Sequence, residues 1–469
     1  MTPFDMVVGP LLMLLAAGVL RRSPLLPTCI ALLSWVQLGV VVIVCWPWLT
    51  VPDAPPLFWT GFVLDGTSSF FLVLTTLVSA AALTQSLGVH PGGGQASFYA
   101  AAALFLLSMS AAVASNDLGY LWISMEATTL ASAPLVAWHR DKASVEAAWK
   151  YLIICSVGIG FAFFGTALLY SASQGVIPPD GSLSLTILRA HAQDLPPAQL
   201  RLAFLFILLG YGTKAGLFPL HNWLPDAHSE APAPASAMLS GAMLNCALLP
   251  LWRCSGLLEA AGAGSFLRIT LWPMGVLTVV AASLFLLRQQ DLKRLLAYSS
   301  MENVGMMTLA IAVGSSNGFG LQAINHSLVK VALFLLAGNL LAQYDTKRIR
   351  SLRGVLQATP LQGALLLCGA LAVVGTPPFG SFAAEWQILA AMLDHGHLLA
   401  VVVVSLSLAV AFVAMCLHVC QVLFGDRLAS AQALSRGVVV VPFLLIAGSL
   451  VLGIMVPGPL LHLLQELPR

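Results

Sequence analysis

The sequence predicts an all-α polytopic membrane protein with about 14 transmembrane helices. Of its 469 residues, 59% are hydrophobic and only 9% are charged, whereas about 25% of residues are charged in soluble globular domains. Apolar runs of about 20 residues, the length that crosses a bilayer, recur from one end to the other. No stretch is left for a soluble domain of ordinary size, so we expect one membrane domain over residues 1–469.

The apolar runs place the individual helices. The first run, Phe4 to Leu20, is followed by Arg21 and Arg22 without a small-residue cleavage site, which indicates a transmembrane helix rather than a removed signal peptide. The seventh and twelfth helices contain prolines and are expected to be interrupted. The predicted helix cores are 4–20, 25–46, 59–87, 97–114, 118–138, 146–170, 202–218, 238–256, 269–287, 295–313, 320–343, 359–391, 398–424 and 437–456.

Basic residues are distributed unevenly between the two sides of this arrangement. Most of them follow odd-numbered helices, and the positive-inside rule places these connections in the cytoplasm. Both termini are then expected on the outer side of the cell (inner) membrane. The connections after odd-numbered helices contain Arg21, Arg22, Arg140, Lys142, Arg288, Lys293, Arg294, Lys347, Arg348, Arg350, Arg353, Arg427 and Arg436, whereas those after even-numbered helices contain Arg189, Arg201, Arg253 and Arg268, with Arg469 at the tail.

Six charged residues fall inside predicted helices, and they are the first candidates for function. A charge near the bilayer centre costs at least about 2.5–3.5 kcal/mol, so such groups usually pair, face water or take part in transport. Some of them could instead be structural ion pairs or snorkelling residues. This alternative is strongest for Lys150, which lies four residues after Glu146. The six are Glu126, Lys150, Lys214, Glu302, Lys330 and Glu385.

The sequence carries no signature of a cofactor or metal site. Its eight cysteines are scattered in apolar segments without a CxxC pair, which is typical of core residues. Walker and HExxH motifs are absent. We therefore expect no cofactor, metal or redox centre on this chain and no nucleic-acid partner. Any oxidoreductase activity would belong to a complex of which this chain is one subunit.

The intramembrane charges recur with similar spacing, which indicates an internal repeat. Glu126 precedes Lys150 by 24 residues, and Glu302 precedes His326 by the same 24. The spacing predicts two five-helix units, helices 4–8 (residues 97–260) and helices 9–13 (residues 265–425). They are preceded by helices 1–3 (residues 1–96) and followed by helix 14 and the tail (residues 435–469). An odd number of helices inverts the second unit relative to the first.

The fourth helix of each unit is the interrupted one. The first break reads LFPLHNWLP and includes His221, and the second reads GTPPFGSF. Opened backbone at membrane depth is tolerated where protein or water satisfies it, so each break predicts a polar cavity, with Lys214 at the first and Glu385 just after the second. Proline kinks that serve only packing are the alternative.

Histidines lie where protons could pass between these cavities. His326 and Lys330, four residues apart, share one face of the eleventh helix, and His418 lies on the thirteenth. Histidine both accepts and donates protons near neutral pH. A hydrogen-bonded structural histidine is the alternative for each of them.

Five stretches together resemble the antiporter-like proton-translocating subunits of respiratory complex I, Mrp-type antiporters and membrane-bound hydrogenases. The variants SSMENVG and SGAMLNCAL are most similar to the hydrogenase-4 and formate hydrogenlyase type, component F. The similarity extends over residues 60–425. The stretches are KAGLFPLHNWLPDAHSEAPAPAS, LWISMEATTL, DLKRLLAYSSMENVGMM, INHSLVKVALFL and GTPPFGSFAAEWQIL.

The resemblance implies a function and assigns roles to residues. The chain is expected to move protons within a redox-driven complex, with other membrane subunits and a peripheral hydrogenase-like module as partners. Glu126 is expected to pair with Lys214, His326 and Lys330 to form the central relay, and Glu385 to be the exit. The sequence departs from many relatives at Asn245, where they have a lysine. Two alternatives remain, an Mrp-like cation/proton antiporter subunit and the membrane subunit of an energy-coupled carbon-uptake module.

Overall fold

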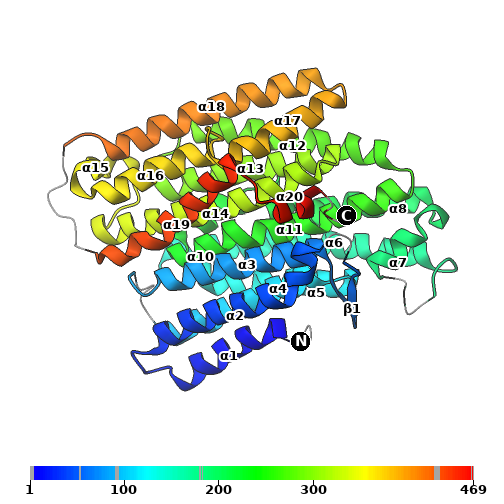
Figure 1. Ribbon diagram of the computed structural model, residues 1–469, viewed down its shortest axis with the longest axis horizontal. Helices are drawn as coiled ribbons and strands as arrows, with labels where there is room; N and C mark the ends of the chain where they lie inside the picture. The colour runs from blue at the N-terminus through cyan, green and yellow to red at the C-terminus, as the bar shows by residue number, and fades with distance from the viewer. Residues whose placement is uncertain are drawn as a thin grey trace.

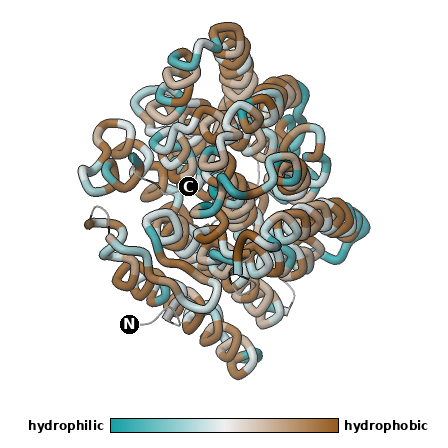
Figure 2. The backbone as a smooth tube through the Cα atoms, turned by 90° about the vertical axis from the view of Figure 1, so that its right-hand side faces the viewer, coloured by the Kyte–Doolittle hydropathy of each residue, from teal (hydrophilic) through white to brown (hydrophobic). Residues whose placement is uncertain are grey.

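The computed structural model describes residues 5–51, 54–89, 94–178, 181, 183–426, 434–465 and 467. Long helices run side by side, with α1 and α2 at one edge and α18 at the opposite edge (Figure 1). Viewed from the end, the helix tubes are predominantly hydrophobic (Figure 2). The elements are α1 (Asp5–Val19), α2 (Leu26–Thr50), β1 (Leu57–Trp59), β2 (Phe62–Leu64), α3 (Gly66–Gln85), α4 (Gln95–Ala114), α5 (Leu118–Val136), α6 (Lys142–Ser173), α7 (Leu185–Ala190), α8 (Pro197–Ala215), α9 (Trp223–Glu230), α10 (Ala233–Met238), the π-helical segment η3 (Leu239–Met243), α11 (Leu244–Ala260), α12 (Gly264–Leu286), α13 (Leu292–Val313), α14 (Ser316–Tyr344), α15 (Val355–Ala358), α16 (Pro360–Val373), α17 (Gly380–Asp394), α18 (Leu398–Leu423), α19 (Val440–Ile454) and α20 (Gly458–Gln465).

The helices confirm a multi-pass membrane protein. In the described part of the chain, nine helices have the length and hydropathy to cross a bilayer, and the shorter α1 and α16 are also apolar. The predicted helices correspond in order to α1–α6, α8 with α9, α10–η3–α11, α12, α13, α14, α16 with α17, α18 and α19. Two residues of the predicted charge pattern, Arg427 and Arg469, lie outside the described residues.

Several acidic residues that the charge pattern left unexplained cap helices. Asp65, Asp117, Asp141 and Asp291 precede α3, α5, α6 and α13, and each accepts a hydrogen bond from a backbone N–H of the first turn at 2.7–2.8 Å. Such caps satisfy backbone donors that the helix leaves free. These carboxylates therefore fix where membrane helices begin.

The third helix begins later than the predicted residue 59. Residues 57–64 form an antiparallel hairpin, β1 with β2, and α3 begins at Gly66. The turn lies at Thr60 and Gly61, which have φ values of 36° and 83°, a backbone conformation that a right-handed helix excludes. The Gly61 carbonyl accepts hydrogen bonds from Asn116 N and Asp117 N at 2.8 and 3.0 Å. The apolar run was extended into the hairpin because hydropathy alone does not separate strand from helix.

Both predicted helix interruptions are confirmed, between α8 and α9 and between α16 and α17. At the first, α8 ends with Gly216 in the left-handed conformation (φ 79°). Neighbouring side chains satisfy the opened backbone there: Trp223 Nε1 donates to Thr213 O at 2.8 Å, and Phe218 N donates to Thr278 Oγ1 of α12 at 3.1 Å. The break is thus enclosed by protein at membrane depth, as its backbone polarity requires.

Corresponding helices of the two predicted units pack in the same way. In the first unit α4 contacts α5, α5 contacts α6, α6 contacts α8 and α9, and α8 contacts α11. In the second unit α12 contacts α13, α13 contacts α14, α14 contacts α16 and α17, and α16 contacts α18. The long α14 lies in the middle of the bundle (Figure 1) and is almost entirely buried.

Small residues bring α6 and α8 into close contact. A Cβ atom added at Gly210 would lie 2.5 Å from the backbone nitrogen of Ala162, and one at Gly165 would lie 2.7 Å from the carbonyl oxygen of Ala203. Glycine at such positions lets membrane helices approach closely. The approach holds Lys214, at the end of α8, against α6.

We predict that Gly210→Leu destabilises the protein by about 1–3 kcal/mol, because the added side chain overlaps backbone atoms of α6. The matched control is Gly160→Leu on α6, since Gly160 is exposed and has no atom within 4 Å of its added Cβ. The midpoint of thermal unfolding of the purified protein in detergent is the measurement. Equal midpoints for the two variants would contradict the close packing.

Candidate functional site

Lys214 is completely buried at the junction of α5, α6 and α8. Its ammonium group donates to Thr129 Oγ1 at 2.7 Å and to the Tyr151 hydroxyl at 2.9 Å. The Tyr151 hydroxyl in turn lies 2.6 Å from Ser132 Oγ. The lysine is therefore held by hydroxyl groups, which hydrogen-bond an amine as well as an ammonium.

Glu126 and Lys214 are brought together, but they do not form the predicted direct pair. Thr129 lies between them, accepting from Lys214 and facing Glu126 Oε2 with its hydroxyl oxygen 3.5 Å away. The other carboxylate oxygen of Glu126 accepts from Ser156 of α6 at 2.7 Å. One threonine hydroxyl thus separates the acid from the base.

The predicted eighth helix, the last of the first unit, contains a π-helical turn, η3. In η3, Met243 accepts a hydrogen bond from the Tyr151 hydroxyl (3.6 Å to Sδ), and Ser240 presents its carbonyl to His326 Nε2 at 3.2 Å. π-Helical turns are rare and frequently occur at functional sites. This turn places one face of the predicted eighth helix between Tyr151 of the first unit and His326 of the second.

Asn245, the residue at which the sequence is expected to depart from relatives, connects α11 to α14. Its amide nitrogen donates to Ser327 Oγ at 2.8 Å, and its carbonyl oxygen is buried without a hydrogen-bond partner within the protein. A buried polar atom of this kind is a site for an ordered water. Asn245 therefore marks the polar position between the two lysine sites.

Lys330 and His326 occupy the same face of α14, as their spacing predicted. Lys330 is completely buried and donates to Leu296 O at 3.0 Å and to Ser299 Oγ, both on α13. Ser300, next to Ser299, lies 2.8 Å from Ser240 Oγ of η3. His326 Nδ1 is buried without a hydrogen-bond partner. Like Lys214, Lys330 is held by neutral oxygens.

Two buried carboxylates, Glu302 and Glu385, lie on helices that pack against α14, which carries Lys330. Glu302 of α13 is 1% exposed, and its Oε2 accepts from Asn303 Nδ2 at 2.8 Å. Glu385 of α17 is 5% exposed and packs against Gly375 in the second helix break. In both residues Oε1 is buried and has no hydrogen-bond partner.

Three further candidates lie apart from this chain of contacts. Lys150 is about half exposed and forms ion pairs with Glu146 at 2.8 Å and Asp226 at 3.3 Å. A structural ion pair, the alternative given for Lys150 from the sequence, therefore describes it best. His221 stacks between Phe218 and Phe285. His418 directs Nδ1 to the carbonyl of Ala414 in its own helix, at 2.7 Å.

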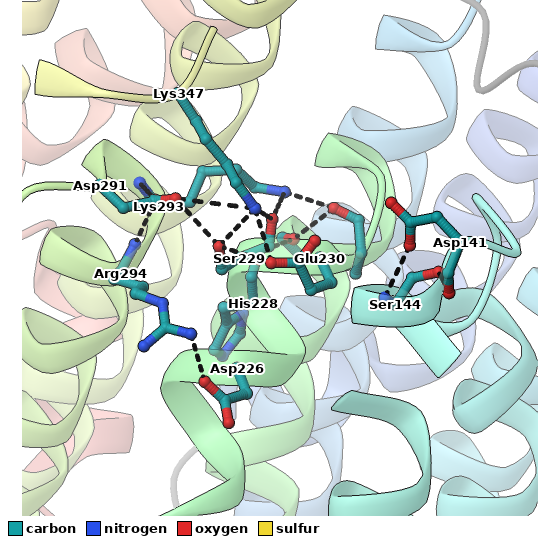
Figure 3. Close-up of polar contacts among 12 residues, drawn as sticks. Asp141, Ser144, Asp226, His228, Ser229, Glu230, Asp291, Lys293, Arg294 and Lys347 are labelled. Carbon is teal, nitrogen blue, oxygen red and sulfur yellow. Dashed lines mark hydrogen bonds and ion pairs between the residues drawn. The ribbon is translucent and has the colours of Figure 1, made fainter. Parts of the chain in front are cut away.

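A cluster of charged residues, which we call the charged mouth, surrounds the end of α9 (Figure 3). Lys347 lies 2.6 Å from Glu230 and 3.7 Å from Asp291, and Arg294 lies 2.5 Å from Asp226. Lys293 is buried and donates to the carbonyls of Ser229 and Ala231. The charged mouth comprises Asp226, Ser229, Glu230, Asp291, Lys293, Arg294 and Lys347.

The charged mouth opens into a hollow of about 1250 Å³. His139 lies in the connection between α5 and α6 and lines the hollow. Burial lowers the pKa of His139, and the positive charge of Lys293 lowers it further. His228, directly before Ser229, is completely buried against the ring of Phe334, and neither of its ring nitrogens has a hydrogen-bond partner. His228 thus lies inside the bundle, next in sequence to Ser229, which lines the hollow.

Sequence analysis did not select several of these residues. Thr129 and Ser132 follow Glu126 at intervals of three, a helical spacing that could have placed them on its face. His228 could have been found as the second histidine of the motif that contains Lys214. The π-helical turn and the role of Asp226 could not, because both depend on contacts between distant segments.

A family model described as "NADH:quinone oxidoreductase/Mrp antiporter, TM" matches residues 115–411. The chain belongs to this family. The matched segment includes Glu126, Lys214, His326, Lys330 and Glu385, so the resemblance is confirmed where the candidate residues lie. The chain is therefore an antiporter-like membrane subunit.

Two named relatives and one solved structure are similar to this chain. A hydrogenase-4 component F homolog of Methylacidiphilum infernorum (isolate V4) is 39% identical over 325 residues, covering 68% of this chain and 68% of the relative. NADH-quinone oxidoreductase subunit N of Desulforudis audaxviator (strain MP104C) is 32% identical over 427 residues, covering 86% and 83%. A chain of the membrane-bound sulfane sulfur reductase, an archaeal respiratory membrane complex, has the same fold, with a TM-score of 0.89, 24% identity and coverage of 99% and 96%.

We predict that Gly375→Ala destabilises the protein more than Gly396→Ala, by about 1–3 kcal/mol. Both glycines have a left-handed backbone, with φ of 66° and 79°, so the strain of adding a side chain there is shared. Only the Cβ at position 375 would overlap the carboxylate of Glu385, whereas position 396 is open. Unfolding midpoints in detergent test the difference, and equal losses would show that Glu385 does not pack against the break.

Proposed function

We propose that this chain moves protons along a buried polar axis, as the membrane subunit of a redox-driven complex of the hydrogenase-4 or complex I type. The observation that carries the proposal is the placement of two completely buried lysines, Lys214 and Lys330, among neutral oxygens. Hydroxyl and carbonyl oxygens hydrogen-bond both forms of a lysine. Each site therefore accommodates the side chain before and after it gives up a proton.

The proposed order of transfer follows the buried polar groups. Protons enter at the charged mouth, reach His228, and are exchanged among Lys214, Lys330 and His326 through the region of Asn245. They leave through Glu385. Moving Glu126 toward Lys214 or away from it, past Thr129, changes the field at the lysine and favours uptake or release of its proton. A charge change in an adjacent subunit is the driving event in this scheme.

This scheme assigns no electron-transfer step to this chain, so partner subunits would carry it out. Electron transfer would take place in a peripheral, hydrogenase-like module, with further membrane subunits between that module and this chain. The names of the relatives, a hydrogenase-4 component and an NADH-quinone oxidoreductase subunit, support this assignment. We place the charged mouth in the cytoplasm and both termini on the outer side of the inner membrane, because the basic connections lie at the mouth.

In the assembled complex reconstituted in vesicles, Lys214→Met is expected to reduce proton translocation by about a hundredfold, the typical contribution of a positioned proton carrier. Lys150→Met should retain translocation within about twofold, because exposed ion pairs contribute little. Uptake measured with a pH-sensitive dye, driven by the native electron donor, is the readout. Unchanged translocation by Lys214→Met would refute the proposed route.

Orientation is tested with a matched pair of exposed glutamines, Gln193 and Gln290, which lie on opposite sides of the predicted membrane. With the native cysteines replaced, Gln193→Cys should react with an impermeant maleimide in intact cells. Gln290→Cys should react only after the membrane is permeabilised. The reverse pattern would place the charged mouth outside and both termini in the cytoplasm.

A second candidate function is cation/proton antiport in an Mrp-like assembly, which the description of the family also names. The discriminating experiment uses vesicles without an electron donor. A sodium gradient that drives proton movement there would favour antiport, whereas proton movement that requires the electron donor favours the redox-driven complex.

A further inference from the structure

Glu302 is a buried carboxylate that the proposed proton route does not include. It projects from α13 near the middle of the helix, ten residues after Leu292, where the helix begins. Together α13, α14 and α17 pack against one another pairwise, so Glu302, Lys330 and Glu385 are contributed by three helices that meet. An unused acid at this depth requires a partner or a function.

The surroundings of Glu302 hold it in one orientation. Asn303 Nδ2 donates to Oε2 of Glu302 and also to the carbonyl of Ser299. Asn303 is itself fixed by Gln322 of α14, whose amide nitrogen donates to Asn303 Oδ1 at 2.8 Å. The amide pair therefore anchors one carboxylate oxygen and leaves Oε1 without a partner.

Lys330 is held one helical turn away from Glu302. It donates to Leu296 O and Ser299 Oγ, and Ser299 precedes Glu302 by three residues, on the same face of α13. Glu385 projects from α17, which packs against both α13 and α14. Glu302 thus lies next to the turn that holds Lys330, on a helix that also contacts the helix of Glu385.

We propose that Glu302 and Glu385 form a carboxylate pair that holds one transferable proton, with Glu302 receiving it from Lys330. The N–H bond of Lys330 breaks and an O–H bond forms at Glu302 Oε1, through bridging water. The proton then passes, again through water, to Oε1 of Glu385, which like Glu302 Oε1 has no hydrogen-bond partner within the protein. Two carboxylates in one buried site resist being ionised together, so the pair retains a proton until one leaves by Glu385. Asn303 and Gln322 are positioning residues.

This inference rests on the proposed proton-translocating function, and one series of variants separates the two. In the reconstituted complex, Glu302→Gln is expected to lower translocation by about a hundredfold, while keeping an acceptor for Asn303. Glu302→Asp should recover translocation to within about tenfold of the wild type, since the transferable proton is restored. Asp394→Asn, at an exposed acid of α17, is the control and should match the wild type.

Lys214→Met in the same series distinguishes a failure of the carboxylate pair from a failure of the proposed proton-translocating function. If Glu302→Gln translocates normally while Lys214→Met does not, the carboxylate pair is wrong and the wider route survives. If Lys214→Met also translocates normally, the proposed function itself is wrong.

Infrared spectroscopy supplies a readout that does not depend on transport. The complex should show the C=O stretching band of a protonated carboxyl, which both Glu302→Gln and Glu385→Gln remove because the remaining carboxylate then faces Lys330 alone. A band that persists in either variant would overturn the pair, and so would the lack of such a band in the wild type. This readout decides the question from Glu385→Gln alone if Glu302→Gln does not assemble.

Discussion

The structure depends on one constraint, that polar groups placed at membrane depth must find partners inside the protein. Two helices are opened there and two lysines are completely buried there. The first opening is satisfied by Trp223 and Thr278, and the lysines are held by hydroxyl and carbonyl groups of α5, α6 and α13. These contacts place polar side chains at the junctions between neighbouring helices.

This constraint explains why the interior contains so many small hydroxyl and amide side chains. Thr129, Ser240, Ser299 and Ser327 each occupy a contact between two helices and hydrogen-bond a partner on the neighbouring one. A serine or threonine brings an acceptor into the core with little volume and without charge. The lysines are thereby separated from the carboxylates by neutral groups, which leaves their charges adjustable rather than locked in ion pairs.

The two units use this arrangement differently. In the first, the acid Glu126 and the base Lys214 face one another across one hydroxyl. In the second, the helices that carry Lys330, Glu302 and Glu385 pack against one another, and Glu385 packs against the helix break. The π-helical segment η3 of the first unit contacts Tyr151 of the same unit and His326 of the second unit. The two predicted units therefore hold electrostatically distinct sites.

Much of the fold could be predicted from the sequence because hydropathy and proline placement act locally. The order of the membrane helices, the two breaks and the shared face of His326 and Lys330 all followed from spacing. Other features could not be predicted, since they depend on how helices cross. The hairpin at residues 57–64 has the same apolar character as a helix, and Thr129 intervenes between Glu126 and Lys214. The ion pair of Lys150 with Asp226 joins segments that lie far apart in the sequence.

The central claim is that a continuous polar path joins the two lysine sites through the neutral side chain of Asn245. The most direct measurement is a map of the assembled complex at a resolution that shows ordered water. The account predicts water at the unpartnered carbonyl oxygen of Asn245, hydrogen-bonded onward toward both Lys214 and Lys330. An apolar, water-free gap between Lys214 and Lys330 would contradict it.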